Sequence, residues 1–267
     1  MTFDLLKARL RQGHQTSGFP REPIQLPQRY RGRPLLDESR CRDACRACAD
    51  ACPTGAIATN PLRIDLGACL FCPLCEEACP EGAIAYTQDY RLAATARADL
   101  VVSSQESKLA AQLDARMRKL FGRSLKLRQV SAGGCSGCEA ELAATGNVVF
   151  DLGRFGIQFV ASPRHADGIV VTGPVTTNMD LALRTTYAAV PTPRIVIAAG
   201  ACAISGGPFA GADASHNGMP ADIPVDLYIP GCPPHPLTIL DGLLRLLGRL
   251  DVNAPGDAKG SNTLYQL

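Results

Sequence analysis

Short apolar runs alternate with stretches of helical periodicity from residue 125 onward. The runs are LKLRQV, GIQFVA, GIVVTG, RIVIAAG and VDLYIPG. Strands that alternate with helices form a parallel sheet with helices packed on its faces. Residues 236–250, PLTILDGLLRLLGRL, predict the last helix, with Pro236 suited to its first turn. The pattern therefore predicts a doubly wound α/β fold over residues 125–250.

The first 36 residues follow another pattern. Phe3, Leu6 and Leu10 recur at helical spacing and predict a short amphipathic helix. The arm that follows, FPREPIQLPQRYRGRPL, contains four prolines. Because proline fixes its backbone and donates no hydrogen bond, we expect this arm to lie extended against another part of the molecule.

A linker helix is expected over residues 93–124, and a mobile or extended tail over residues 251–267. The apolar face of this helix would consist of Leu109, Leu113, Met117 and Leu120. Its basic residues would be Arg116, Arg118, Lys119 and Arg123. This combination is compatible with a helix on a membrane surface. It is also compatible with a linker that packs on a neighbouring subunit, which we favour.

Composition narrows the classes of function. Charged residues make up 19% of the chain and hydrophobic residues 46%, as in a globular protein. The net charge of +2 is unevenly spread, with residues 1–36 and 91–128 basic and residues 37–90 acidic. This alternation indicates several protein contacts and no continuous nucleic-acid face.

Twelve cysteines are the strongest chemical signal. The amino terminus, MTFDLLKARLRQG, has no apolar segment of the kind found in signal peptides, so a secreted disulfide framework is disfavoured. No run approaches the ~20 apolar residues of a membrane span. Metal ligation in a reducing cytoplasm is the favoured interpretation.

Eight of the cysteines lie in an internal repeat within residues 37–92. CRACADACPTGAI (45–57) and CPLCEEACPEGAI (72–84) align at an offset of 27 residues. The second half has the spacing C-x2-C-x2-C-x3-C-P of two-cluster bacterial ferredoxins, in which the fourth cysteine binds the other cluster. The paired C-x3-C-P ends disfavour zinc knuckles. We therefore expect two [4Fe-4S] clusters, one bound by Cys41, Cys45, Cys48 and Cys79, and the other by Cys69, Cys72, Cys75 and Cys52.

The first half departs from this spacing at one point, because three residues separate Cys41 from Cys45 where two are expected. Arg42, at the expected ligand position, cannot replace a thiolate. Either Cys41 ligates through a widened loop, or the site has three thiolates and holds a [3Fe-4S] cluster. We favour the widened loop.

The other four cysteines belong to the predicted sheet. They follow the ends of three predicted strands and are Cys135, Cys138, Cys202 and Cys232. The carboxyl ends of parallel strands meet at one edge of the sheet, where open α/β folds bind ligands. Neighbouring glycines would let the backbone approach the sulfur atoms. These cysteines predict a third [4Fe-4S] cluster.

Both parts of the chain resemble known subunits. Residues 1–95, including YRGRPLLDESRC, resemble the two-cluster ferredoxin-like subunit of formate hydrogenlyase and complex I. The strings CSGCEAEL, FGIQFVASPRHADGIVVTGPVT, GACAISGG and VDLYIPGCPPHP resemble the small subunit of membrane-bound group 4 [NiFe] hydrogenases, which is homologous to the proximal-cluster subunit of complex I. The complex I subunit has two adjacent cysteines where this chain has C-S-G-C, which favours the hydrogenase branch.

The resemblance implies a flavodoxin-like domain over residues 125–250, fused to an α+β two-cluster ferredoxin domain over residues 37–92. It also implies a proximal [4Fe-4S] cluster beside a catalytic large subunit on another chain. Arg164 and His165 fall in a loop between two strands, on the edge where we expect this cluster, and are candidates for tuning its potential. A salt bridge with Asp167 is an equally weighted alternative. Glu139 and Glu141 are expected to cap a helix rather than relay protons.

The chain is thus expected to be an electron-transfer subunit with three [4Fe-4S] clusters and no catalytic residue of its own. Its expected partners are a [NiFe] hydrogenase-type large subunit, integral membrane subunits, and an electron-donor or electron-acceptor subunit or ferredoxin. We expect it on the cytoplasmic side of the cell membrane, as a peripheral subunit. The alternative is a complex I-like or nickel-free hydrogenase relative that reduces quinone or another acceptor. A zinc-binding or scaffold protein is a further, disfavoured alternative.

Overall fold

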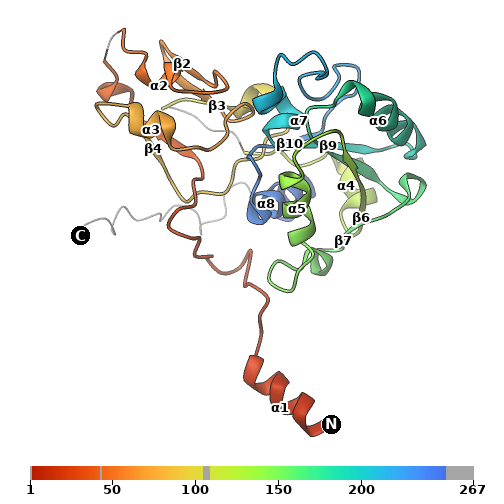
Figure 1. Ribbon diagram of the computed structural model, residues 1–267. Coiled ribbons are helices and arrows are strands. Elements are labelled where there is room, and N and C mark those ends of the chain that lie inside the picture. Colours follow the sequence, from red (N-terminus) through yellow and green to blue (C-terminus); the bar gives the residue numbers. More distant parts are fainter. Residues whose placement is uncertain (1, 43, 105–108, 251–267) are drawn as a thin grey trace.

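A five-stranded parallel sheet forms the centre of the carboxyl-terminal part of the chain (Figure 1). The computed structural model describes residues 2–42, 44–104 and 109–250. The strands are β6 (Leu125–Ser131), β7 (Ile157–Phe159), β8 (Gly168–Thr172), β9 (Ile195–Ala199) and β10 (Leu227–Ile229). Their spatial order, β7-β6-β8-β9-β10, is the flavodoxin-like order. The predicted α/β fold class is confirmed.

Helices follow four of these strands. They are α5 (Gly137–Ala144), α6 (Thr177–Ala189), α7 (Ala201–Ser205) and α8 (Pro236–Leu246), with short 3-10 helices at η3 (Leu152–Phe155), η4 (Pro163–His165) and η5 (Gly207–Phe209). Strands β8 and β9 are buried along their whole length, which explains their continuous apolar sequence. All residues of α8 are buried as well, and this helix matches the last helix expected from the sequence.

The cysteine-dense region (residues 37–92) is built from two similar halves. Its helices are α2 (Ala47–Asp50) and α3 (Leu74–Ala78). The associated strands and 3-10 helix are β1 (Pro34–Leu36), β2 (Ile57–Thr59), β3 (Leu62–Asp65), β4 (Ile84–Tyr86) and η1 (Glu38–Arg40). Helices α2 and α3, and strands β2 and β4, begin 27 residues apart. The sequence repeat is therefore also a structural repeat.

The prediction of a linker helix over residues 93–124 is wrong for most of this range. The described part contains η2 (Arg97–Leu100), strand β5 (Val101–Val102) and a helix only at α4 (Ala115–Phe121). Strand β5 pairs with β3, and Leu100 and Val102 are buried in the core of the cysteine-dense region. Tertiary contacts thus override the helical propensity of this segment.

The proline-rich arm lies against the α/β region, as expected. Phe19 is buried, and its ring makes edge contacts with Tyr90 and Phe155. Arg154 donates hydrogen bonds to the backbone oxygens of Ser17 and Phe19 at 2.9 and 2.8 Å. Helix α1 (Thr2–Gln12), which confirms the predicted short helix, projects away from the body of the molecule (Figure 1).

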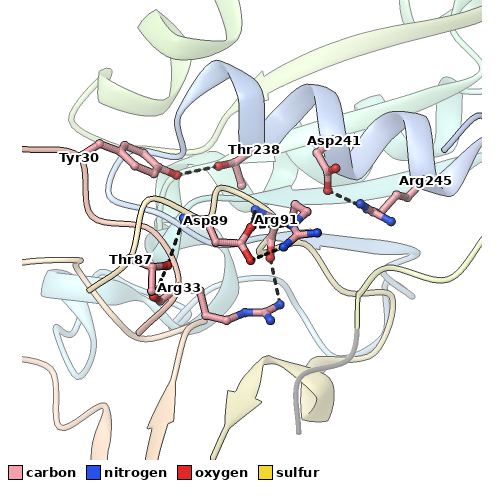
Figure 2. Close-up of polar contacts among 8 residues, drawn as sticks. All are labelled: Tyr30, Arg33, Thr87, Asp89, Arg91, Thr238, Asp241 and Arg245. Carbon is pink, nitrogen blue, oxygen red and sulfur yellow. Dashed lines mark hydrogen bonds and ion pairs between the residues drawn. The ribbon is translucent and has the colours of Figure 1, made fainter. Parts of the chain in front are cut away.

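Polar contacts join the arm, the segment after β4 and helix α8 (Figure 2). The hydroxyl oxygens of Tyr30 and Thr238 lie 3.4 Å apart. Thr87 Oγ1 donates to Arg33 O at 2.8 Å, and Arg33 Nη2 donates to Arg91 O at 3.3 Å. The arm is therefore tied both to the cysteine-dense region and to the last helix of the sheet region.

Two ion pairs lie beside these contacts (Figure 2). Arg91 Nε donates to Asp89 Oδ1 at 2.7 Å, and Arg245 Nε donates to Asp241 Oδ2 at 2.9 Å. The side chains of Asp241 and Arg245 are each only 3% exposed. Burial raises the pKa of Asp241, while the charge of Arg245 opposes this shift. The charges of Arg91 and Asp89 also act on Asp241, so the two parts of the chain meet at a largely buried, charged interface.

The predicted tail, residues 251–267, lies outside the described residues. Within the part of the chain that the structure describes, no helix combines the length and the apolar character that a membrane span requires.

Candidate metal-binding sites

None of the twelve cysteines, all of which the structure describes, forms a disulfide, and they lie in three groups. We call these groups site 1 (Cys41, Cys45, Cys48 and Cys79), site 2 (Cys52, Cys69, Cys72 and Cys75) and site 3 (Cys135, Cys138, Cys202 and Cys232). Sites 1 and 2 belong to the cysteine-dense region, and site 3 belongs to the α/β region.

Site 1 surrounds a cavity. Its four cysteines line this cavity together with Arg40, Arg42, Leu62, Pro80, Glu81, Ala83 and Ile84. Burial raises the pKa of Cys48, and the nearby thiols of Cys79 and Cys41 raise it further. Cys79, from the second half of the repeat, therefore lies with the cysteines of the first half. Its position agrees with the expected crossing, while ligation itself remains a prediction.

The additional residue between Cys41 and Cys45 leaves the rest of the repeat in register. Ala44, directly before Cys45, has a φ of 60°, and its equivalent before Cys72, Phe71, has a φ of 54°. The insertion is therefore confined to positions 42 and 43, of which position 43 lies outside the described residues. Cys41 still lines the cavity of site 1. This position favours the widened loop over a site with three thiolates.

Site 2 is more deeply buried than site 1. Burial raises the pKa of Cys69 to about 11, and the thiols of Cys75 and Cys52 contribute to the shift. Burial also raises the pKa of Cys75, with Cys72 and Cys52 among the groups that raise it further. Cys52, from the first half of the repeat, therefore lies with the three cysteines of the second half.

Tyr86 places its hydroxyl group against two sulfur atoms of site 2. Its Oη lies 3.5 Å from Cys75 Sγ and 3.6 Å from Cys69 Sγ. The ring of Phe71 packs beside that of Tyr86, with centroids 6.3 Å apart. Burial, together with the Cys69 and Cys75 thiols, raises the pKa of Tyr86, so its hydroxyl keeps its proton at neutral pH.

Backbone N–H groups point at sulfur in both halves of the repeat. Ala56 N donates to Cys52 Sγ at 3.3 Å, and its equivalent Ala83 N donates to Cys79 Sγ at 3.2 Å. The turns that aim these groups pass through Gly55 and Gly82, with φ of 63° and 58°. Glycine adopts this left-handed conformation without steric cost. Each of sites 1 and 2 thus receives one such hydrogen bond on its crossing cysteine.

Site 3 lies at the carboxyl edge of the parallel sheet. Cys135 follows β6, Cys138 lies in the first turn of α5, Cys202 lies in α7 after β9, and Cys232 follows β10. Burial, together with the charges of the other three thiols and of Glu139, raises the pKa of Cys138 to about 12. The structure therefore brings together the four cysteines that the sequence predicted at this edge.

Two glycines make room for the sulfur atoms of site 3. Gly200 has a φ of 91°, and a Cβ at this position would lie 2.4 Å from Cys138 Sγ. A Cβ on Gly207 would lie 3.1 Å from Cys202 Sγ. Backbone thus approaches two of the four thiols, and at Gly200 it does so more closely than any other residue type would allow.

Glu139 fastens the start of α5 to the sheet. Its Oε1 accepts hydrogen bonds from Ser131 Oγ and Thr172 Oγ1, each at 2.6 Å. Burial acts to raise the pKa of Glu139, but these two hydrogen bonds outweigh it and the pKa is lowered. Ser131 and Thr172 end adjacent strands, β6 and β8. The carboxylate therefore positions the helix that carries Cys138 through side chains of the sheet, a role different from the expected helix capping.

Sites 2 and 3 are neighbours. Burial and Cys135 raise the pKa of Cys232, and Cys72 of site 2 also contributes, so these thiols are close enough to interact electrostatically. Nearby, Ser205 Oγ in α7 donates to Gly67 O in the cysteine-dense region at 3.0 Å. The two parts of the chain thus meet where site 2 approaches site 3.

Arg164 and His165 lie in the loop between β7 and β8, and their role in tuning a cluster stays a prediction. They belong to η4, which leads directly into the first residue of β8. Asp167 N donates to Lys126 O at 2.7 Å, and Lys126 N donates to Asp167 Oδ2 at 2.7 Å. Lys126 is at the start of β6, whereas Cys135 follows its end. Both ends of this loop lie at the same level of the sheet, because Phe159 and Gly168 each pair with Leu127 of β6.

Sequence reasoning missed the polar side chains that surround the cysteines. Tyr86, Ser131 and Thr172 contact a cysteine or the carboxylate that positions one. Tyr86 could have been found from the repeat, because it occupies the position of Thr59 at the offset of 27 residues. Ser131 and Thr172 gave a weaker signal, as the polar last residues of two apolar strands.

The donor sets of the three sites fit iron–sulfur clusters. Each site offers four thiols, which are soft ligands suited to these clusters. Backbone N–H groups donate hydrogen bonds to sulfur atoms at sites 1 and 2. At site 3, glycines leave space beside the sulfur atoms that a Cβ would fill. Within the described residues, no three cysteine, histidine, aspartate or glutamate side chains converge as closely as a single metal ion requires.

A known family matches the α/β region. The match is to the NADH ubiquinone oxidoreductase 20 kDa subunit and covers residues 135–246. All four cysteines of site 3 lie within this range, and the eight cysteines of sites 1 and 2 lie before it.

Individual relatives come from three kinds of protein. A probable membrane-bound hydrogenase subunit of Pyrococcus furiosus is 39% identical over 150 residues, which are 56% of this chain and 90% of the relative. Formate hydrogenlyase subunit 7 of Escherichia coli is 43% identical over 141 residues, 53% of this chain and 55% of the relative. An NADH-quinone oxidoreductase subunit of Heliobacterium modesticaldum is 45% identical over 118 residues, 44% of this chain and 67% of the relative.

Proposed function

This chain belongs to the family of the NADH ubiquinone oxidoreductase 20 kDa subunit, and from that membership we propose that it carries electrons through three [4Fe-4S] clusters. Its relatives are subunits of membrane-bound hydrogenase and of complex I-like oxidoreductases, so it is a subunit of an oxidoreductase complex. We further propose that this complex is a membrane-associated, formate hydrogenlyase-like [NiFe] hydrogenase.

The observation that supports the proposal most strongly is the grouping of the twelve cysteines. Each site collects four thiols, and sites 1 and 2 exchange one cysteine between the two halves of the repeat. Cys72 and Cys232 bring site 2 next to site 3. Electrons would therefore pass between site 1 and site 3 by way of site 2. The proposed domains follow from this arrangement: a two-cluster ferredoxin domain over residues 37–92 and a flavodoxin-like domain over residues 125–250.

The protein would contribute ligands, spacing and hydrogen bonds. Bound iron–sulfur clusters supply one-electron transfer. Sulfur ligands that accept N–H hydrogen bonds stabilise the reduced, more negative state. The N–H groups of Ala56 and Ala83 would do this at sites 2 and 1. Glu139, through Ser131 and Thr172, would hold Cys138 in place at site 3.

Site 3 also indicates where a partner binds. Cys135 and Cys232 are exposed, whereas Cys138 and Cys202 are buried. An iron–sulfur site open to water on one side is expected to be covered in the complex. We propose that a [NiFe] hydrogenase-type large subunit covers it, that integral membrane subunits attach the complex to the cytoplasmic side of the membrane, and that an electron-donor or electron-acceptor subunit or ferredoxin contacts site 1.

Anaerobic purification of the complex that assembles on this chain tests the proposal. We expect iron and nickel together, a large subunit with two terminal C-x2-C pairs, and reduction of the clusters by hydrogen. Zinc in place of iron would contradict electron transfer by this chain.

A complex I-like or nickel-free oxidoreductase is the second candidate, favoured by the similarity to the NADH-quinone oxidoreductase subunit of Heliobacterium modesticaldum. In this case the purified complex would contain iron but no nickel, and its clusters would be oxidised by a quinone. Hydrogen would then leave the clusters oxidised, which distinguishes the two functions in one preparation.

A further inference from the structure

The repeat allows a comparison between site 1 and site 2 at equivalent positions. Both sites receive a backbone N–H on the crossing cysteine, from Ala83 at site 1 and from Ala56 at site 2. The halves differ at the last residue of the equivalent strands β4 and β2, which is Tyr86 in the second half and Thr59 in the first. A tyrosine hydroxyl extends much farther from the backbone than a threonine hydroxyl, and that of Tyr86 reaches two cysteine sulfurs.

The position of Tyr86 is well defined by its neighbours. Its Oη lies 3.6 and 3.5 Å from the sulfur atoms of Cys69 and Cys75, within hydrogen-bond distance for sulfur. Its ring packs against Phe71, whose own N–H donates to Cys69 Sγ at 3.3 Å. Strand β4 is paired with β1, which fixes the backbone of Tyr86 opposite Pro34. The hydroxyl is therefore held where two ligands of the proposed site 2 cluster meet.

We propose that Tyr86 is a positioning residue for electron transfer, whose hydroxyl donates to the Cys69 and Cys75 sulfurs and raises the reduction potential of site 2 above the value that site 2 would otherwise have. This inference rests on the proposed function and adds a potential-setting residue to it. Reduction adds negative charge to the cluster and its sulfur ligands, and a donor aimed at those sulfurs stabilises the added charge. The hydroxyl makes the site between site 1 and site 3 easier to reduce.

The test is an EPR-monitored redox titration of the full chain with its clusters, kept anaerobic. In Tyr86→Phe we expect the reduced-to-oxidised ratio of one cluster to fall about tenfold at a fixed potential, equivalent to about 59 mV for one electron. The other two clusters should titrate as in the wild type. The matched control is Tyr187→Phe, because Tyr187 lies under Arg194 and away from the cysteines. Unchanged potentials for all clusters in Tyr86→Phe would overturn the proposal.

A second variant covers the case in which Tyr86→Phe binds less iron. Replacement of Tyr86 by 3-fluorotyrosine keeps the ring and the hydroxyl but makes the hydroxyl a stronger donor. The potential of the same cluster should then rise, and an unchanged or lower potential would overturn the proposal. The wild-type titration tests the proposed function separately, since fewer than three signals there would contradict three clusters. Only the difference between wild type and variant reports on Tyr86.

Discussion

The cysteine-dense region and the α/β region hold their thiols by different means. In the first, a 27-residue repeat places the cysteines on two short helices and their flanking turns, α2 and α3. In the second, four thiols come from three loops at one edge of the sheet, and Gly200 leaves room for one of them. The repeat tolerates a local insertion, because the additional residue beside Cys41 leaves the other cysteines in register. In a site assembled from separate loops, such as site 3, we expect cluster binding to depend on each close contact between the backbone and a sulfur atom.

The largest expected effect comes from Gly200→Ala. The new Cβ would lie 2.4 Å from Cys138 Sγ on a backbone with a φ of 91°. We expect site 3 to lose its cluster, which is about four iron atoms per chain. Iron analysis after anaerobic purification measures this loss.

The matched control is Gly55→Ala in the cysteine-dense region. Gly55 has a φ of 63°, but a Cβ there would meet nothing within 4 Å. We expect full iron content and a loss of about 1–2 kcal/mol in the free energy of unfolding, from the left-handed backbone alone. Loss of iron from this variant, with iron retained in Gly200→Ala, would reverse the comparison between the regions.

The next largest expected effect is a loss in the free energy of unfolding when a buried ion pair is broken. Asp241→Asn removes the carboxylate that accepts from Arg245 Nε, and both side chains are 3% exposed. Breaking a buried pair costs about 3–5 kcal/mol. Asp50→Asn is the control, because Asp50 and Arg46 are 67% and 68% exposed and such pairs contribute about 0–1 kcal/mol. Anaerobic denaturant unfolding should separate the two variants, and equal losses would contradict a buried, charged interface.

The smallest expected effect is a pH dependence of stability that originates in the α/β region. Burial lowers the pKa of His235 below its usual 6.5. Below about pH 6.5 the unfolded chain therefore binds a proton that the folded chain does not, and stability falls as the pH drops. The cysteine-dense region contains no histidine.

His235→Asn tests this origin. His235 Nδ1 accepts from Leu237 N at the start of α8, and asparagine can cap a helix in the same way. We expect a smaller loss of thermal stability between pH 7 and pH 5.5 than in the wild type. His14→Asn, in the exposed residues after α1, serves as the control. An unchanged pH dependence in His235→Asn would place the titrating group elsewhere.

The sequence predicted both the parallel sheet and the three groups of cysteines. Strand β8 was recognisable because it is apolar throughout, and Cys202 and Cys232 were placed by the rule that carboxyl ends of parallel strands share an edge. The role of Arg164 and His165 in tuning a cluster stays a prediction, because the sequence places them in a loop between two strands and does not show where along the loop a residue lies. The expected linker helix was wrong because β5 pairs with β3, a contact that local periodicity cannot show.

The central claim is that each of the three sites holds a [4Fe-4S] cluster. Iron and sulfide analysis combined with EPR spin counting on the fully reduced, anaerobic chain tests it most directly. We expect about 12 iron atoms per chain and three interacting spins, as three four-iron clusters require. About eight iron atoms with two spins, or zinc in place of iron, would contradict it.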